Sequence, residues 1–172
     1  MDLTEAQRQE FEDRGWTVLS DVFGPEEIEL LTDAALDVLE RPGPEVGREA
    51  DGSPHVSWGM HLFNEQLAVL CRHENLINPS RTLLDNEVYV HQSRINIKQT
   101  NGSIVAWHQD FGTYHRVDGV PHPKGVMIAV FLYDVTEVNA PLLAVPGSHK
   151  EGLVSTASVR SEEHTSELQS PD

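Results

Sequence analysis

The segment 107–110, which reads WHQD, carries the side chains best suited to chemistry in this chain. His108 and Asp110 are separated by one residue, and on an extended segment residues two apart point to the same side. The imidazole and the carboxylate can therefore reach one metal ion together. Two histidines and one carboxylate form the facial triad that holds non-haem Fe(II) and leaves coordination positions open. The His-x-Asp motif alone is weak, and by itself it favours a surface turn.

A segment of alternating polarity precedes this motif. From Glu87 the hydrophobic period changes to two, which predicts a strand over residues 87–98. One face of that strand begins with Val88 and Val90 and then becomes polar, with Gln92, Arg94, Asn96 and Lys98. Four polar residues in a row are either solvated or line a pocket, and the change from apolar to polar favours the pocket. The Lys98 ammonium has the charge to pair with a dicarboxylic cosubstrate.

The N-terminal part predicts two helices. The first spans Thr4 to Arg14, with Thr4 and Gln7 as a capping box and Gly15 at its end. The second opens at Pro25. It has one apolar stripe for a core: Ile28, Leu31, Ala35, Leu36 and Leu39.

The remaining segments predict further helices and then strands. Residues 16–22 read as a short strand and residues 41–54 as a loop. Leu67 to Cys71 reads as helical, and Ser80 as the cap of another helix that ends near Asp85. Strands follow at residues 126–134 and 142–145, the second one before a turn at residues 146–148. Helices followed by strands predict an α+β domain built on a β-sandwich or barrel.

The bulk composition limits the functions open to this chain. A length of 172 residues fits one domain, and a net charge of −16 argues against nucleic acid and anionic membranes as partners. The single cysteine, Cys71, can form no internal disulfide, which favours a reducing, cytoplasmic compartment. No signal peptide or apolar run of about 20 residues is present.

Three longer motifs resemble the phytanoyl-CoA dioxygenase family, and most closely its ectoine hydroxylase branch. They are HQSRINIK, WHQDFGTYHRVDGVP and FLYDVTEVNAPLLAVPGSHKEG, and they cover about residues 87–153. The opening FEDRGWTVLSDVFGPEEIELL resembles the family more loosely. The resemblance implies a double-stranded β-helix, a cupin-like jelly roll with N-terminal helices. It also implies a dioxygenase that uses Fe(II), 2-oxoglutarate and O2 to hydroxylate a small molecule, with release of succinate and CO2.

The resemblance also implies roles for single residues. His108 and Asp110 match the first two iron ligands, and Lys98 matches a residue that binds a 2-oxoglutarate carboxylate. Gln92 matches a substrate-contacting position, and Asn96 on the same face is a weaker candidate for binding the cosubstrate.

The residues after the motif are expected on the substrate side, namely Phe111, Tyr114 and His115. The segment PGSH at 146–149 matches a structural turn, so we read His149 as part of that turn and not as the third ligand. The presence of Asp110 indicates hydroxylation and not halogenation, because halide replaces the carboxylate in related halogenases.

Two departures from the family pattern stand out. The ectoine branch usually has tryptophan where this chain has Tyr114, which argues against ectoine itself as the substrate. The family's distal iron-binding histidine and the basic residue that clamps 2-oxoglutarate come later in the chain than any native segment here.

The last residues look foreign. The segment RSEEHTSELQS at residues 160–170 matches the translation of a common sequencing adapter, and a disordered acidic tail is the alternative. We therefore expect a partial dioxygenase domain over residues 1–159, incomplete at its C-terminus, and a non-native tail over residues 160–172, so that His164 is not counted as a ligand. Such a truncated chain is expected to be inactive. The competing interpretation is a non-catalytic cupin-like binding domain, and the oligomeric state stays open.

Overall fold

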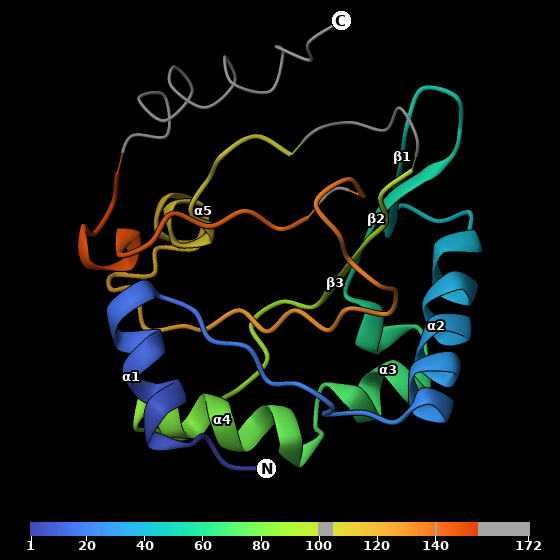
Figure 1. The fold of residues 1–172 in the computed structure, drawn as a ribbon. Coiled ribbons are helices and arrows are strands. Elements are labelled where there is room, and N and C mark those ends of the chain that lie inside the picture. Colours follow the sequence, from blue (N-terminus) through green and yellow to red (C-terminus); the bar gives the residue numbers. More distant parts are fainter. Residues whose placement is uncertain (100–104, 140, 155–172) are drawn as a thin grey trace, which may run out of the picture.

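The computed structural model describes residues 1–99, 105–139 and 141–154. Its elements, in chain order, are α1 (Glu5–Arg14), α2 (Pro25–Glu40), β1 (Val46–Arg48), β2 (Pro54–Trp58), η1 (Met60–Leu62), α3 (Glu65–Leu70), α4 (Glu74–Leu84), β3 (Arg94–Asn96), α5 (Asp110–Val117) and η2 (Ser148–Lys150). Four helices precede a small sheet's last strand, and α5 lies on the opposite side of the molecule from α2 (Figure 1). Within the described residues no helix has the length and apolarity needed to cross a membrane. The predicted tail at residues 160–172 lies outside the described residues.

Helix α1 begins and ends as its sequence predicts. The Thr4 hydroxyl accepts a hydrogen bond from the Gln7 N–H at 3.2 Å, and the Gln7 side-chain oxygen accepts one from the Thr4 N–H at 2.9 Å. These reciprocal bonds form the capping box and satisfy two donors that the first turn leaves free. Gly15 ends the helix in the left-handed region with φ at 91°.

Helix α2 supplies the largest part of the core. It starts at Pro25, and its buried face comprises Leu31, Ala34, Ala35, Val38 and Leu39. Val38 is completely buried and packs with Leu67 and Leu70 of α3. The expected apolar stripe is confirmed at three of its five positions, while Leu36 is exposed. Each buried aliphatic side chain contributes about 1.5–3 kcal/mol, so this cluster anchors the helical layer.

The sheet has three antiparallel strands in the order β1-β2-β3. Val46 pairs with Ser57 of β2, and Trp58 of β2 pairs with Arg94 of β3. The prediction of an uninterrupted loop over residues 41–54 was therefore wrong. With only three residues, β1 is too short to show a period of its own, and its pairing with β2 makes it a strand.

Helices α3 and α4 test the predictions for the middle of the chain. The helix expected near residues 67–71 is confirmed as α3. The prediction that Ser80 caps the next helix was wrong, because α4 starts at Glu74 with His73 as its cap. The Ser80 hydroxyl instead donates to the Leu76 carbonyl at 2.8 Å, the bond that a serine inside a helix makes to the preceding turn. The end of α4 at Asp85 is confirmed.

The predicted strands are shorter in the structure or absent from it. Of residues 87–98 only Arg94–Asn96 form a strand, and none is assigned over residues 16–22, 126–134 or 142–145. Within the predicted strand 126–134, side chains at residues 130–133 still alternate between packed and exposed, as they would in a strand. Val130 and Leu132 pack against the helical core, while Phe131 and Tyr133 are 54% and 67% exposed. A strand also needs a hydrogen-bonding neighbour, and among the described residues this segment has none.

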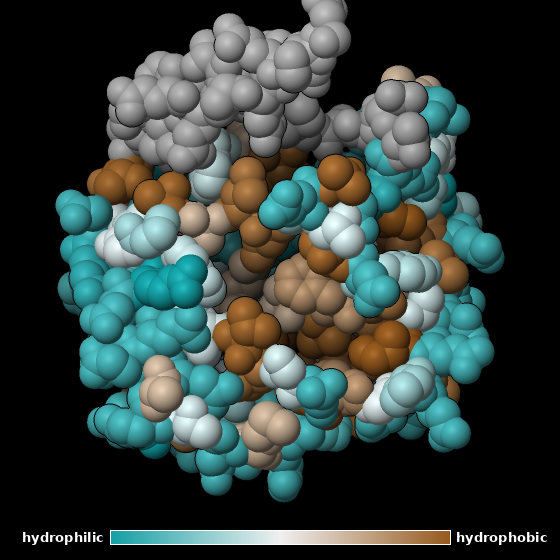
Figure 2. Space-filling model, in the orientation of Figure 1, coloured by the Kyte–Doolittle hydropathy of each residue, from teal (hydrophilic) through white to brown (hydrophobic). Residues whose placement is uncertain are grey.

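Phe131 and Tyr133 are two of several exposed apolar residues in this part of the chain. Beyond Phe131 and Tyr133, the exposed apolar residues of this part of the chain are Met127, Ile128, Val135, Val138, Leu142, Leu143 and Val145. Figure 2 shows apolar residues gathered around the hollowed middle of one face. Surfaces of this kind promote association.

We predict that Gly15→Ala destabilises the chain more than Gly119→Ala. Both glycines have positive φ, 91° and 69°, so each alanine adds backbone strain of about 1 kcal/mol. A Cβ at Gly15 would also lie 2.6 Å from the His149 ring, whereas no atom of the described residues lies within 4 Å of one at Gly119. Urea denaturation should show about 2 kcal/mol lost for Gly15→Ala and about half of that for the control. Equal losses would show that the His149 contact carries no energy.

Candidate metal centre

The side chains of His108 and Asp110 converge. The His108 Nε2 atom lies 3.3 Å from the Asp110 Oδ1 atom. Gln109 between them is extended, with φ at −113° and ψ at 123°, and Asp110 is the first residue of α5. The spacing therefore places both side chains on one side, as the sequence predicts.

A second contact orients the imidazole. The His108 Nδ1 atom lies 2.9 Å from the Ala106 carbonyl, an acceptor only, so we assign the ring proton to Nδ1. The Nε2 lone pair then faces the carboxylate oxygen. At this separation the two acceptor atoms can share one cation, either a proton or a metal ion. The donor pair therefore fits a divalent metal, and its side chains, 45% and 28% exposed, are open to one.

Gln109 fixes the backbone that carries both donors. Its side-chain amide donates to the Gly152 carbonyl at 2.9 Å, and its side-chain oxygen accepts from the Val154 N–H at 2.9 Å. Both hydrogen-bonding groups of this amide are thus tied to residues 152–154. This anchorage holds the extended conformation on which the convergence of the donors depends.

Arg94 is a site residue to which the sequence assigned no role. Its guanidinium donates to the Asp110 Oδ1 atom at 3.5 Å, so that oxygen lies near both Arg94 and His108. Arg94 lies on the predicted polar face of the strand, between Gln92 and the cosubstrate candidate Lys98. That face was the signal, but sequence alone does not show which polar side chain meets the motif.

A polar and aromatic cluster joins α5 to the segment before β3. The Tyr114 hydroxyl donates to the Gln92 side-chain oxygen at 3.1 Å. The rings of His91 and Tyr114 meet edge to face at 4.7 Å, and His91 Nε2 lies 3.4 Å from an Asp118 carboxylate oxygen. Burial raises the pKa of the Tyr114 hydroxyl, and the negative charge of Asp110 raises it further, while Arg94 acts in the opposite direction.

The other predicted site residues lie apart from these contacts. Lys98 and Asn96 are exposed, and within the described residues no hydrogen bond or ion pair joins either to the donor pair. The rings of Phe111 and His115 on α5 lie 5.5 Å apart, and His115 Nδ1 lies 2.8 Å from the Val120 carbonyl. The structure thus brings Gln92 and Tyr114 together with the motif and leaves Lys98 and Asn96 as predictions.

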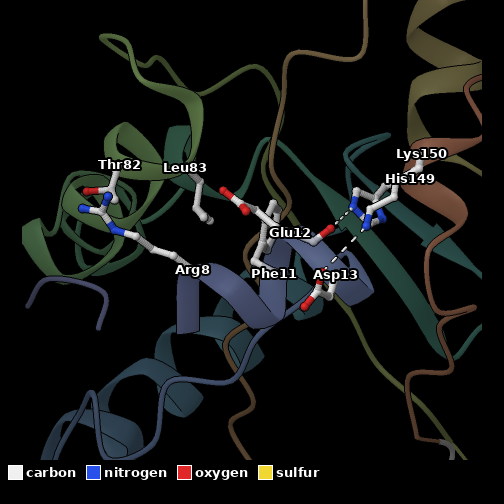
Figure 3. Close-up of a pocket in the computed structure, with 8 residues that line it drawn as sticks. All are labelled: Arg8, Phe11, Glu12, Asp13, Thr82, Leu83, His149 and Lys150. Carbon is white, nitrogen blue, oxygen red and sulfur yellow. Dashed lines mark hydrogen bonds and ion pairs between the residues drawn. The ribbon is translucent and has the colours of Figure 1, made fainter. Parts of the chain in front are cut away.

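His149 lies at the end of α1. Its Nε2 atom is 3.1 Å from the Glu12 carbonyl, and the Gly147 N–H donates to the Arg14 carbonyl at 3.0 Å. Figure 3 shows His149 beside Glu12 and Asp13 at the edge of a cavity between α1, α4 and η2. These contacts agree with a structural turn. Among the described residues no three His, Cys, Asp or Glu side chains are grouped to hold a metal, so the donor pair there has no third protein ligand.

Comparison with known sequences decides the family. A family model described as "Phytanoyl-CoA dioxygenase (PhyH)" matches residues 11–172. The chain belongs to the phytanoyl-CoA dioxygenase family.

Its relatives include two kinds of named enzyme. Ectoine dioxygenase of Bordetella bronchiseptica is 37% identical over 156 residues, which are 87% of this chain and 50% of the relative. L-proline trans-4-hydroxylase of Streptomyces griseoviridis is 38% identical over 143 residues, 81% of this chain and 53% of the relative. The chain spans about half the length of the curated relatives it matches.

Solved structures of EctD from S. alaskensis show the same fold in part. The complex with 2-oxoglutarate and 5-hydroxyectoine superimposes with a TM-score of 0.67 at 30% identity, covering 71% of this chain and 45% of that chain. The structure with bound Fe gives a TM-score of 0.61 at 29% identity, covering 66% of this chain and 42% of that chain. About two thirds or more of this chain therefore shares its fold with part of these structures, and the N-terminal helices and small sheet do not conflict with that fold.

We predict that Asp110→Asn lowers the pKa of Tyr114. The carboxylate disfavours the phenolate, so removing its charge should let the hydroxyl ionise at lower pH. Tyrosinate absorbance measured against pH should show this shift, with Tyr114→Phe identifying the transition. Glu137→Gln, which removes a carboxylate that does not act on Tyr114, should leave the transition in place. An unchanged transition in Asp110→Asn would mean that α5 does not hold the two side chains together in solution.

Proposed function

We propose that this chain supplies the first two iron ligands of an Fe(II)- and 2-oxoglutarate-dependent dioxygenase that hydroxylates a small molecule and releases succinate and CO2. The observation that carries this is the 3.3 Å convergence of His108 and Asp110 within a chain of this family. The proposed fold of the whole protein is the double-stranded β-helix.

Each residue of the proposed centre has its own role. His108 would hold iron through Nε2 while its Nδ1–H donates to the Ala106 carbonyl, and Asp110 would add the negative charge that favours a dication. Gln109 maintains the spacing of the two donors. When bound, iron supplies the activation of dioxygen. Lys98 is proposed to pair with a carboxylate of 2-oxoglutarate, with Asn96 as a second polar contact.

The substrate is proposed to meet α5 and the segment before β3. Gln92 and Tyr114 bond to each other there, so a substrate meets an oriented amide. The relatives are named for ectoine and for L-proline at nearly equal identity, which supports a small polar substrate without choosing between them. Tyr114 in place of the usual tryptophan argues against ectoine itself.

The alternative function is a cupin-like domain that binds without catalysis, or an inactive fragment of the oxygenase. The observation that favours the fragment is the donor count, because the described residues offer two protein ligands where a facial triad has three. Both alternatives predict no turnover. They differ in whether Fe(II) binds specifically at the donor pair.

We predict that the chain binds Fe(II) weakly and that His108→Ala and Asp110→Ala each remove this binding. Each substitution deletes one of two donors, and a single donor holds iron poorly. Anaerobic calorimetric titration with Fe(II) measures the loss. His122→Ala removes an exposed histidine elsewhere and serves as the control that should bind as before. Specific binding that survives His108→Ala would reject the proposed centre.

We predict different kinetic effects for the donors and for Lys98 in a protein that spans the full length of the relatives. His108→Ala and Asp110→Ala should abolish substrate-dependent succinate release. Lys98→Ala should mainly raise the 2-oxoglutarate concentration for half-maximal rate, because it removes a binding charge and leaves the metal ligands in place. Lys124→Ala, another exposed lysine, is the matched control. A fall in kcat with no change in that concentration would exclude the role of Lys98.

A further inference from the structure

Ser93 is a buried polar residue directly behind the candidate metal centre. It is 7% exposed and lies between Gln92 and Arg94. Neighbouring side chains on an extended segment face opposite sides. Gln92 and Arg94 both contact α5, through Tyr114 and Asp110, so Ser93 faces the helical layer.

The turn after β2 makes three hydrogen-bonding contacts with two atoms of Ser93. The Gly59 N–H donates to the Ser93 carbonyl at 2.7 Å, and the His61 N–H donates to the Ser93 hydroxyl oxygen at 3.5 Å. The His61 Nδ1 atom lies 2.5 Å from the same oxygen. The Cys71 thiol is a further hydrogen-bond partner of the Ser93 side chain. The Ser93 hydroxyl can donate to His61 Nδ1 or accept from it, depending on the tautomer of the ring. We call the pair His61 and Ser93 the clamp.

The clamp acts on Arg94 more directly than on the metal donors. Arg94 is the next residue after Ser93 and pairs with Trp58, two residues before Met60 of η1. His108 and Asp110, in contrast, are held by Ala106 and by the anchorage of Gln109 to residues 152–154. Loss of the clamp should therefore move Arg94 and leave the donor pair in place.

Arg94 competes with a metal ion for one atom. Its guanidinium lies 3.5 Å from the Asp110 Oδ1 atom, the same oxygen that faces His108. A bound cation at that oxygen must share it with Arg94 and also meets the repulsion of the guanidinium charge. The pair is partly exposed, with side chains 29% and 28% accessible, so its strength is modest.

We propose that His61 is a positioning residue that, through Ser93, holds Arg94 against Asp110 and so lowers the metal affinity of the donor pair. The inference rests on the proposed function, because it needs metal at His108 and Asp110. The clamp keeps the carboxylate neutralised while the site is empty, and metal binding has to displace Arg94.

The test uses the 172-residue chain and Co(II), a probe for Fe(II) that dioxygen does not readily oxidise. Titration is followed by the paramagnetic broadening of the His108 ring signals in nitrogen-detected spectra, with His108→Ala identifying them. His61→Ala, Ser93→Ala and Arg94→Met should each tighten Co(II) binding by roughly two- to fivefold, the effect of a partly exposed ion pair. A merely structural role would give weaker or unchanged binding.

Three controls sharpen the result. Ser93→Ala in the Arg94→Met background should add nothing, because both act through the same cation. His61→Asn, whose side-chain oxygen can accept from the Ser93 hydroxyl, should bind Co(II) as the unaltered chain does. Ser80→Ala removes a hydroxyl that is equally buried and bonded within α4, and it should leave the affinity unchanged.

Each failure has its own meaning. If Co(II) does not broaden the His108 signals of the unaltered chain, the proposed metal centre is wrong and the inference falls with it. If broadening occurs but Arg94→Met or Ser93→Ala fails to tighten binding, only the inference is overturned. Full additivity of Ser93→Ala and Arg94→Met also overturns it. Should His61→Ala fail to fold, Ser93→Ala and the His61→Asn variant decide the matter.

Discussion

The oxygen Oδ1 of Asp110 is shared by two groups, and the rest of the site is arranged around it. His108 Nε2 lies 3.3 Å away with its lone pair forward, and the Arg94 guanidinium lies 3.5 Å away with its charge. A nearby cation stabilises a carboxylate in such a position. The Arg94 guanidinium supplies one, and a proton or a metal ion can supply another. The local fold determines which of these cations has access.

Two separate supports deliver the groups to that oxygen. The donors come from residues 108–110, which Gln109 ties to residues 152–154, and Arg94 comes from β3, which pairs with β2. The second support reaches into the helical core, because Ile95 beside Arg94 packs against the cluster around Val38. The same short strand therefore faces the core with one side and the site with the other. The packing of Ile95 against the core therefore helps to position Arg94 at the site.

Local signals in the sequence were sufficient where a single segment determines its own conformation. The Thr4 capping box, the left-handed Gly15 and the spacing of His108 and Asp110 are all properties of a few adjacent residues, and each has the predicted geometry. The faces of the strand also followed from its period, since Ile95 points inward and Arg94 outward.

Features that depend on distant partners were not predictable in this way. The three residues of β1 are a strand only because β2 lies beside them, and His73 displaced Ser80 as the cap of α4. The contact of Arg94 with Asp110 depends on where α5 lies. The contact of Ser93 with His61 depends on a turn 32 residues away in the chain. The family resemblance predicted the function more specifically than the hydrophobic periodicity did, because the motif at residues 107–110 is ambiguous without its context.

The exposure of the donor pair limits its affinity. His108 and Asp110 are 45% and 28% exposed, so water competes for the metal and screens the Asp110 charge. The same two groups covered by protein would attract a dication more strongly, provided that the remaining coordination positions were filled. The apolar surface around Phe131 and Tyr133 is similarly uncovered. Within the described residues, the structure thus leaves both the metal donors and these aromatic side chains accessible to water.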